Sequence, residues 1–303
     1  MLDYHLHLWP HSEATTWLSV DQVAEYCETA AAKGVTQIAL TEHLHRFTQA
    51  TDVVGRFWER AEDAPAVRAE IAVYFDHHAR SDLDAYVTLC ESAKAAGLPV
   101  VTGLEVDYYA GQMDEVGALL DGYPFDVLLG SVHWIGAWQF DSIESAVHMA
   151  EWEARDVDAC WEAYTRCLEE LAATRTCDVL AHPDLIKLAG FIPDAPAEWW
   201  DRIAEAAVAS AMSAEVSSAG WAKPVGEQYP ARGLLERFAA NGVRFTTASD
   251  AHRNERVADR ASELAALLRD VGVSSLSSYV GRTRVEVPLE DPLPASSAQH
   301  APT

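Results

Sequence analysis

Histidine and carboxylate side chains recur in this sequence just after short apolar runs that are typical of buried strands. His5 and His7 flank a leucine near the start of the chain, and on a strand both rings would face the same side. Five further apolar runs are each followed by side chains of this kind: His43, Glu105, His133, His182, and Asp250 with His252. One histidine at a strand end is commonly an ordinary polar residue, but six strands that each deliver such a group indicate a shared site.

A metal centre is the chemistry that this set of side chains predicts. Burying so many imidazoles without partners would cost about 1–3 kcal/mol for each ring. Divalent ions remove that cost, and Zn, Mn and Fe accept a mixture of neutral imidazole and carboxylate ligands. Glu13 and Asp107 lie nearby in the sequence, and we interpret both as solvated surface acids outside the ligand set. His148 falls in an acidic helical stretch and is expected to be exposed.

Alternating strand and helix patterns must position these side chains. Expected strands cover residues 35–41, 99–105, 125–131, 178–181, 214–216 and 245–248, and expected helices cover residues 18–33, 83–96, 157–174, 199–211 and 234–241. Ser19 is a plausible N-cap for the first helix. Repeated strand–helix units favour an α/β fold with a parallel sheet, and six or seven units favour a closed, TIM-like barrel. Catalytic residues of such barrels gather where strands end.

Two segments depart from this rhythm. Residues 46–80 are polar and mixed, and we expect an insertion over one rim of the barrel. Residues 287–303 carry four prolines and no aromatic residue, which predicts a flexible tail. Residues 1–286 would then form a single domain.

Composition limits the partners. The chain has 303 residues, with 47 acidic against 22 basic side chains and a formal net charge of −25. Such an excess of negative charge argues against nucleic acid or a membrane surface as the main partner. A small anionic metabolite would need local positive charge, which bound metal ions supply. No segment is typical of a signal peptide or a membrane span, so a cytoplasmic protein is expected. The oligomeric state stays open.

The motifs and their order resemble the polymerase and histidinol phosphatase (PHP) family. The matching stretches run from the start of the chain to residue 252: His5-Leu6-His7, Pro10-His11, Thr41-Glu42-His43, Gly103-Leu104-Glu105, Gly130-Ser131-Val132-His133, Ala181-His182-Pro183-Asp184 and Ser249-Asp250-Ala251-His252. Residues 182–187 and 218–230 further resemble the histidinol-phosphatase branch of that family.

The resemblance implies a distorted (β/α)7 barrel of the PHP type, with a rim insertion and a site for two to three divalent ions (Zn, Mn or Fe). One ion would be held by His5, His7, Glu105 and Asp250. A second would share Glu105 and add His133 and His182, and a third would be held by His11, His43 and His252. His11 enters this set through the resemblance alone, because strand logic would have left it as a loop residue.

The expected chemistry is hydrolysis of a phosphate monoester. Two metal ions bridged by a carboxylate lower the pKa of a shared water, which can then attack phosphorus. Glu105, Asp250 and His252 are the expected catalytic residues. Expected contacts to the substrate come from Lys223, Lys187, Arg253, Arg46 and His45. The donor of the proton to the leaving group stays open between a metal-bound water and Asp250.

The resemblance implies L-histidinol phosphate as substrate and a step of histidine biosynthesis as the role. Alternatives are a broader PHP phosphoesterase acting on nucleotide or sugar phosphates and a non-catalytic PHP metal-binding module. The chain is too short and too acidic to suggest a polymerase component. One departure leaves the substrate open: the histidinol-phosphatase branch commonly carries an arginine where this chain has Ala222. Lys223 or an arginine of the insertion could replace it.

Overall fold

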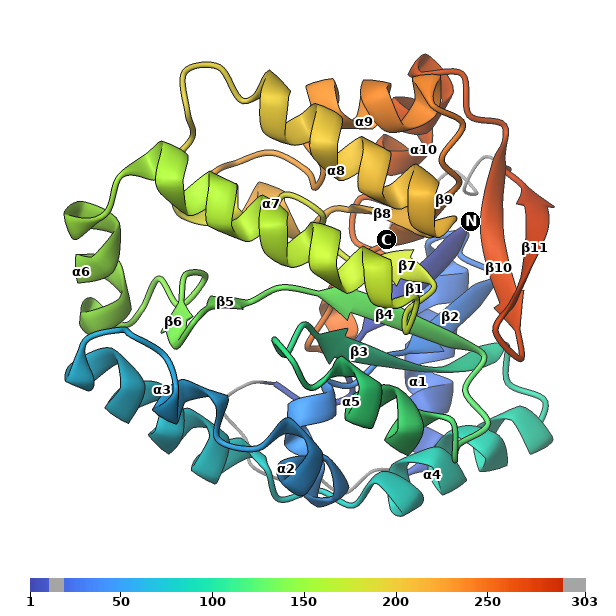
Figure 1. The fold of residues 1–303 in the computed structure, drawn as a ribbon. Coiled ribbons are helices and arrows are strands. Elements are labelled where there is room, and N and C mark those ends of the chain that lie inside the picture. Colours follow the sequence, from blue (N-terminus) through green and yellow to red (C-terminus); the bar gives the residue numbers. More distant parts are fainter. Residues whose placement is uncertain (11–18, 291–303) are drawn as a thin grey trace, which may run out of the picture.

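Seven parallel strands form the centre of the protein (Figure 1). The computed structural model describes residues 1–10 and 19–290. The strands follow one another around the sheet in the order β1 (Leu2–Leu6), β2 (Gln37–Leu40), β3 (Val100–Asp107), β4 (Val127–Ser131), β7 (Val179–Leu180), β8 (Ser213–Ser217) and β9 (Phe245–Ala248). Their carboxyl ends therefore meet at one rim, as the sequence predicted.

The first and last strands of this sheet close it into a barrel. The backbone N–H of Asp250 donates to the carbonyl of His5 at 2.8 Å, and that of His7 donates to the carbonyl of Ala251 at 2.7 Å. These hydrogen bonds lie at the carboxyl ends of β1 and β9, which Figure 1 shows side by side. The expected α/β barrel with seven strands is confirmed, and its closure brings the two ends of the motif series together.

Helices surround the barrel, with the bounds α1 (Val20–Ala32), α4 (Leu83–Ala95), α5 (Met113–Leu120), α7 (Val157–Thr174), α8 (Ala197–Ser210), α9 (Arg232–Ala240) and α10 (Ala261–Asp270). The expected cap of α1 is present, because the Ser19 hydroxyl accepts a hydrogen bond from the N–H of Gln22. Asp156 caps α7 in the same way through the N–H of Ala159. Sequence analysis had not predicted α5 and α10.

The segment expected as a rim insertion is mostly helical. It contains α2 (Thr48–Val54), the short 3₁₀ turn η2 (Phe57–Glu59) and α3 (Pro65–His78). Val67, Ile71 and Phe75 are buried along one face of α3, so this segment contributes to the core as well as to the rim. The segment after β4 forms a small hairpin of β5 (Trp134–Ile135) and β6 (Trp138–Gln139), followed by α6 (Ala146–Ala154).

A C-terminal hairpin of β10 (Ser275–Val280) and β11 (Thr283–Pro288) covers the opposite end of the barrel from the site. Tyr279 donates to Ser213 at 2.7 Å, at the start of β8, and Ser278 lies 2.8 Å from the hydroxyl of Tyr4 in β1. Because β11 extends to Pro288, the first two residues of the expected tail belong to a strand. The rest of that tail, from residue 291, lies outside the described residues.

A glycine in β3 allows the strand to pass close to its neighbour. All eight residues of β3 are buried, and a Cβ on Gly103 would lie 2.8 Å from Cγ2 of Thr41 and 3.1 Å from the carbonyl oxygen of Leu40. Glu105 follows two residues later on the same strand. Among the helices of the described residues, none combines the length and apolarity that a membrane span requires.

Candidate metal centre and substrate cavity

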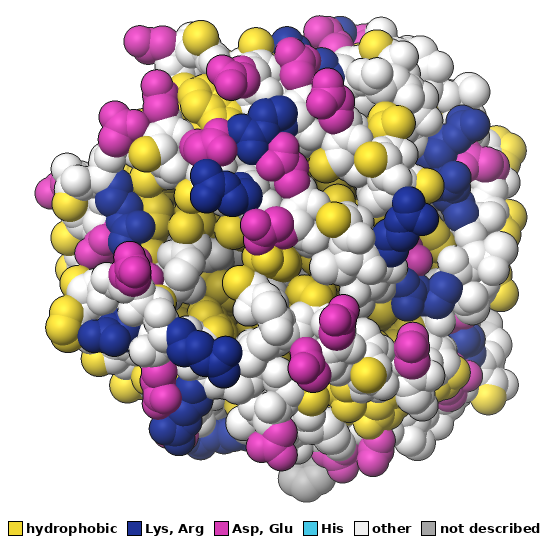
Figure 2. Space-filling view, in the orientation of Figure 1, with side chains coloured by type: hydrophobic (Ala, Val, Ile, Leu, Met, Phe, Trp, Pro, Cys, Tyr) yellow, Lys and Arg dark blue, Asp and Glu magenta, His cyan; other side chains and the backbone are white. Residues whose placement is uncertain are grey.

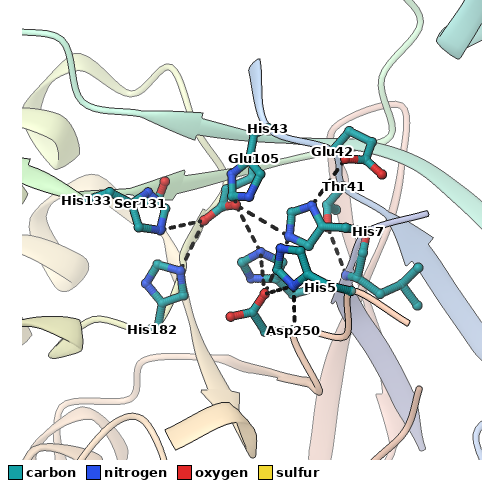
Figure 3. A network of polar contacts seen from close by, with 12 residues as sticks. His5, His7, Thr41, Glu42, His43, Glu105, Ser131, His133, His182 and Asp250 are labelled. Atoms are coloured by element: carbon teal, nitrogen blue, oxygen red, sulfur yellow. Dashed lines mark hydrogen bonds and ion pairs between the residues drawn. The ribbon is translucent and has the colours of Figure 1, made fainter. Parts of the chain in front are cut away.

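Five histidine rings surround the carboxylate of Glu105 (Figure 3). Its Oε2 lies 2.7 Å from Nδ1 of His43 and 3.2 Å from Nε2 of His5. Its Oε1 lies 3.1 Å from Nε2 of His182 and 3.5 Å from Nε2 of His133. His7 approaches Oε2 at 3.6 Å through Nε2. Glu105 is completely buried, so the barrel brings together one carboxylate and rings that lie on β1 or just after β1, β2, β4 and β7 in its interior.

Asp250 forms a second focus beside Glu105. Its Oδ1 lies 3.4 Å from Nε2 of His7, 3.7 Å from Nε2 of His5 and 3.7 Å from Nδ1 of His252. The rings of His7 and His252 stack at 4.1 Å between centroids, and those of His7 and His43 stack at 4.3 Å. The eight predicted ligands that fall within the described residues are thus gathered in one cluster.

The spacing of these atoms fits divalent ions. Nitrogen and oxygen ligands at about 2.0–2.2 Å from an ion lie about 3.0–3.5 Å from one another. Ligand atoms within 4.8 Å of one another occur in the sets His5–His7–Asp250, His5–Glu105–His182, His43–Asp107–His133 and His7–His43–His252. The first two sets share His5 and the last contains both residues expected beside His11. His11 itself lies outside the described residues.

Buried carboxylates hold the outer nitrogens of two rings. Glu215 lies 2.8 Å from Nδ1 of His5 and also accepts the backbone N–H of His182 at 3.2 Å. Glu42 lies 3.4 Å from Nδ1 of His7. Such partners fix the orientation of a ligating ring and raise its basicity. Sequence analysis missed both residues, although a carboxylate within an apolar strand such as β8 is itself a signal.

Asp107 corrects an expectation. It is completely buried, not solvated, and lies 2.5 Å from Nδ1 of His133 and 3.3 Å from Nδ1 of His45. The reason is the twofold period of a strand: Asp107 lies two residues after Glu105 on β3 and therefore faces the same side. His45 in turn contacts the hydroxyl of Tyr74 at 3.1 Å, so it lies behind Asp107.

Charge is divided unevenly over the rings. Burial opposes the imidazolium of His5, yet the carboxylates of Glu215 and Glu105 outweigh it and hold the pKa well above its ordinary value. Burial likewise opposes the imidazolium of His133, but its carboxylate neighbours raise the pKa to about 10. Burial lowers the pKa of His43 well below its ordinary value. A metal ligand must be unprotonated, so an ion bound here would replace protons on some of these rings.

Two of the predicted ligands have unusual backbone angles. His182 has φ of 26° and Asp250 has φ of 51°, a region that side chains other than glycine seldom adopt. The backbone N–H of His182 donates to Glu215 and that of Asp250 donates to the carbonyl of His5, and these hydrogen bonds hold the two conformations. Strained backbone of this kind concentrates at functional sites.

A cavity of about 350 Å³ opens above the cluster. His43, Glu105, His133, His182, Asp250 and His252 line it together with side chains from the surrounding loops. Figure 2, in the orientation of Figure 1, shows hydrophobic side chains between α7 and α3 but no histidine on this face, so the cluster is covered from this side. The predicted ligands thus face a space into which a small molecule fits.

The substrate-contact predictions divide into two groups. Lys223, Arg253 and His45 line the cavity. Lys187 does not: it is buried against Asp184 at 2.9 Å and Glu227 at 2.7 Å. Its charge is therefore neutralised inside the protein.

Arg46 also lies away from the cavity lining. It is buried, donates to the carbonyl of Trp9 at 3.2 Å and lies 3.4 Å from Glu42. The structure therefore gives no support to an insertion arginine as the replacement for the one missing at Ala222. Ala222 itself lines the cavity, as does Arg256, a cation that sequence analysis did not select. His148, expected to be exposed, is buried beneath the β5–β6 hairpin, where its Nδ1 accepts from the N–H of Gln139.

Known proteins resemble this chain over most of its length. A probable histidinol-phosphatase of Deinococcus radiodurans is 29% identical over 274 residues, which are 90% of this chain and 94% of the relative. The crystal structure of histidinol phosphate phosphatase from Lactococcus lactis, complexed with zinc, L-histidinol and phosphate, matches with a TM-score of 0.68 and 18% identity, covering 94% of this chain and 98% of that one. A Listeria monocytogenes protein proposed to have the same activity matches with a TM-score of 0.69 and 19% identity, covering 87% and 99%.

These two structural likenesses bear on the fold, since both identities are low. The family follows from the sequence, because a model of the PHP domain matches residues 5–219, more than two thirds of the chain. The match includes residues of every barrel strand except β9. This chain belongs to the PHP domain family.

Proposed function

We propose that this protein hydrolyses L-histidinol phosphate to L-histidinol and phosphate. The observation that carries the proposal is the Glu105 carboxylate, enclosed by five histidine rings at the base of a cavity with cations at its rim. Membership of the PHP domain family and the likeness to a probable histidinol-phosphatase support it.

The proposed metal ligands are His5, His7, His11, His43, Glu105, His133, His182, Asp250 and His252. Divalent ions bound there would lower the pKa of a coordinated water and neutralise charge on the phosphoryl group. Zinc is the ion in the Lactococcus lactis structure, and the imidazole-rich donor set of this chain suits Zn, Mn or Fe. Two to three ions per chain are proposed.

The chain's own residues orient the reaction. In the overall reaction a water oxygen bonds to phosphorus, the bond from phosphorus to the ester oxygen breaks, and the alcohol oxygen gains a proton. We assign Glu105 to the bridge between ligand sets, because both its oxygens face rings on different sides. Among the proposed ligands within the described residues, Asp250 and His252 have the most accessible side chains, each 20% exposed, so they border the position of the substrate.

Cations of two loops provide the phosphate contacts in this proposal. Lys223 follows β8, and Arg253 and Arg256 follow β9, and all three line the cavity. Both loops leave the carboxyl ends of strands, where barrel enzymes bind phosphate. Arg256 also pairs with Asp259 at 2.9 Å, which orients its guanidinium. His45 is assigned to holding Asp107 in place.

A panel of phosphate esters tests the proposal. The purified protein, supplied with Zn, Mn or Fe, is expected to hydrolyse histidinol phosphate with kcat/KM of at least ~10⁴ M⁻¹s⁻¹, a normal value for an enzyme on its own substrate. If a nucleotide or sugar phosphate is preferred by more than about tenfold, ~1.4 kcal/mol in transition-state binding, the assignment of histidinol phosphate as substrate is wrong. The assignment of the protein as a phosphoesterase would then remain. If no ester is hydrolysed, the remaining explanation is that the protein is a non-catalytic metal-binding module.

The proposal implies a step of histidine biosynthesis. A small phosphorylated metabolite is then the partner, and bound metal ions would supply the local positive charge that so acidic a chain needs to hold it. A cytoplasmic location stays a prediction. We further propose that residues 1–286 form one domain, which is supported by a hydrophobic core that includes residues from Met1 to Tyr279.

A further inference from the structure

The cavity has two chemically different linings. The loops after β8 and β9 supply the cations Lys223, Arg253 and Arg256. The other lining comes from α3 and from the segment between β4 and α6, and it contains Tyr74, Trp134, Gln139 and Asp141. A substrate of mixed charge would find partners for both its parts.

Asp141 is a carboxylate that the proposed reaction does not use. It lines the cavity, but it belongs to none of the candidate metal-ligand sets. Its Oδ1 is buried and has no hydrogen-bond partner within residues 1–10 and 19–290. A buried acceptor that lacks a donor is costly, and such a group in a native site calls for a ligand or water.

Other buried carboxylates nearby have partners. Asp107 contacts His133 and His45, and Glu215 contacts the ring of His5. Asp141 instead interacts at longer range with His133, Lys223 and His182, and burial raises its pKa above the ordinary value. Its carboxylate therefore lies beside the metal cluster, in a position where a cationic donor from a bound molecule would satisfy it.

The proposed substrate carries such a donor. L-Histidinol phosphate has a primary ammonium on the carbon next to the ester carbon, so a phosphoryl group at the metal cluster brings the ammonium into the adjoining part of the cavity. We propose that Asp141 binds this ammonium group and selects amine-bearing phosphate esters over neutral ones. The inference rests on the proposed function and names the residue that sets its substrate class.

Two matched esters test the inference without histidinol phosphate. Ethanolamine phosphate and 2-hydroxyethyl phosphate have similar size and leaving groups, and differ in an ammonium against a hydroxyl. The wild-type protein with its metal ions is expected to prefer ethanolamine phosphate by at least about tenfold in kcat/KM. No preference would overturn the role of Asp141, whether or not any variant folds.

Asp141→Asn removes the charge and keeps the shape. It is expected to lower kcat/KM for ethanolamine phosphate and histidinol phosphate by about 30-fold or more, chiefly through KM. The value for 2-hydroxyethyl phosphate is expected to change by less than about threefold. Metal content and melting temperature are measured alongside, and Gln139→Ala, an uncharged change in the same lining, is the control that should leave the preference for the amine unchanged.

Other outcomes contradict the inference in distinct ways. Equal losses on both alkyl esters, with p-nitrophenyl phosphate spared, would indicate that Asp141 donates a proton to poor leaving groups. No loss on any ester would remove Asp141 from the reaction. A wild-type protein that prefers the amine in the matched pair but does not hydrolyse histidinol phosphate would refute the proposed function and leave the role of Asp141 intact.

Discussion

At the scale of single residues, Glu105 is the point on which the site depends. Both of its oxygens face histidine nitrogens, at distances from 2.7 to 3.6 Å, and the residue is fully buried. Burial opposes the charged form of Glu105, but the rings of His43 and His5 outweigh that effect and hold the pKa of Glu105 well below its ordinary value, so the carboxylate stays ionised. A carboxylate in this position can serve two ions at once.

Glu105→Gln is therefore expected to lower kcat by on the order of 10³-fold or more while the fold persists, because an amide cannot bridge two cations as a carboxylate does. Steady-state kinetics on the preferred ester, with circular dichroism for the fold, measure this. His45→Ala is the matched control and should be much milder, since His45 contacts Asp107 from behind. Near-normal turnover in Glu105→Gln would mean that the bridge is assigned wrongly.

Ala222 offers a gain-of-contact test in the same cavity. Ala222→Arg places a guanidinium among the lining residues, where it can hold a phosphoryl group with two hydrogen bonds. KM for small monoesters is expected to fall by roughly three- to tenfold. Ala222→Gln, of similar reach but uncharged, should leave KM near the wild-type value. An unchanged KM in the arginine variant would place the phosphate elsewhere.

The sequence predicted the metal ligands better than the residues that contact those ligands and hold them in place. Histidines after apolar runs could be selected because parallel strands end at one rim. Asp107 and Glu42 lie beside predicted ligands, yet their burial depends on which way the strand faces in the closed barrel. Asp141 lies in an irregular segment after β6, where no periodicity indicates what a side chain faces. Lys187 was selected for its charge, and only the fold reveals its partners Asp184 and Glu227.

At the scale of elements, the strands of the barrel and most of its helices followed from the sequence, whereas α5, α10 and the segments that interrupt the strand–helix order did not. Helix α7 has the predicted bounds, because Asp156 caps its start and buried positions such as Trp161 and Leu168 recur along one face. The segment that forms α3 seemed a polar insertion, although Ile71 and Phe75 lie at helical spacing. The β10–β11 hairpin was missed because its burial comes from contacts with strands more than 60 residues away.

Gly103→Ala tests how closely β3 must pack. The added Cβ would lie 2.8 Å from Thr41 Cγ2 and 3.1 Å from a backbone oxygen of Leu40, so the strand must shift. We expect a loss of about 1–3 kcal/mol in the free energy of unfolding, measured by urea denaturation. Gly117→Ala, in α5, is the control: the nearest atom to the added Cβ would be Oγ1 of Thr176 at 3.8 Å, and alanine there should be neutral or stabilising. Equal effects at both sites would contradict the packing argument.

At the scale of the whole molecule, the proposed function requires an acidic protein to bind an anionic substrate. The formal net charge of −25 repels phosphate at long range, and the cations of the rim are few. The barrel resolves this by concentrating ligands for positive ions at one end, while the β10–β11 hairpin covers the other. Neither the mixed surface in Figure 2 nor the composition reveals that the two ends of the barrel differ in this way. The difference arises because the seven strands all end at one rim.

Metal content, measured together with activity, tests the central claim most directly. Elemental analysis of gently purified protein is expected to find two to three divalent ions per chain. Removal of these ions with a strong chelator should abolish hydrolysis of histidinol phosphate, and added zinc, manganese or iron should restore it. Fewer than one ion per chain, with hydrolysis undiminished in the chelator, would contradict the account.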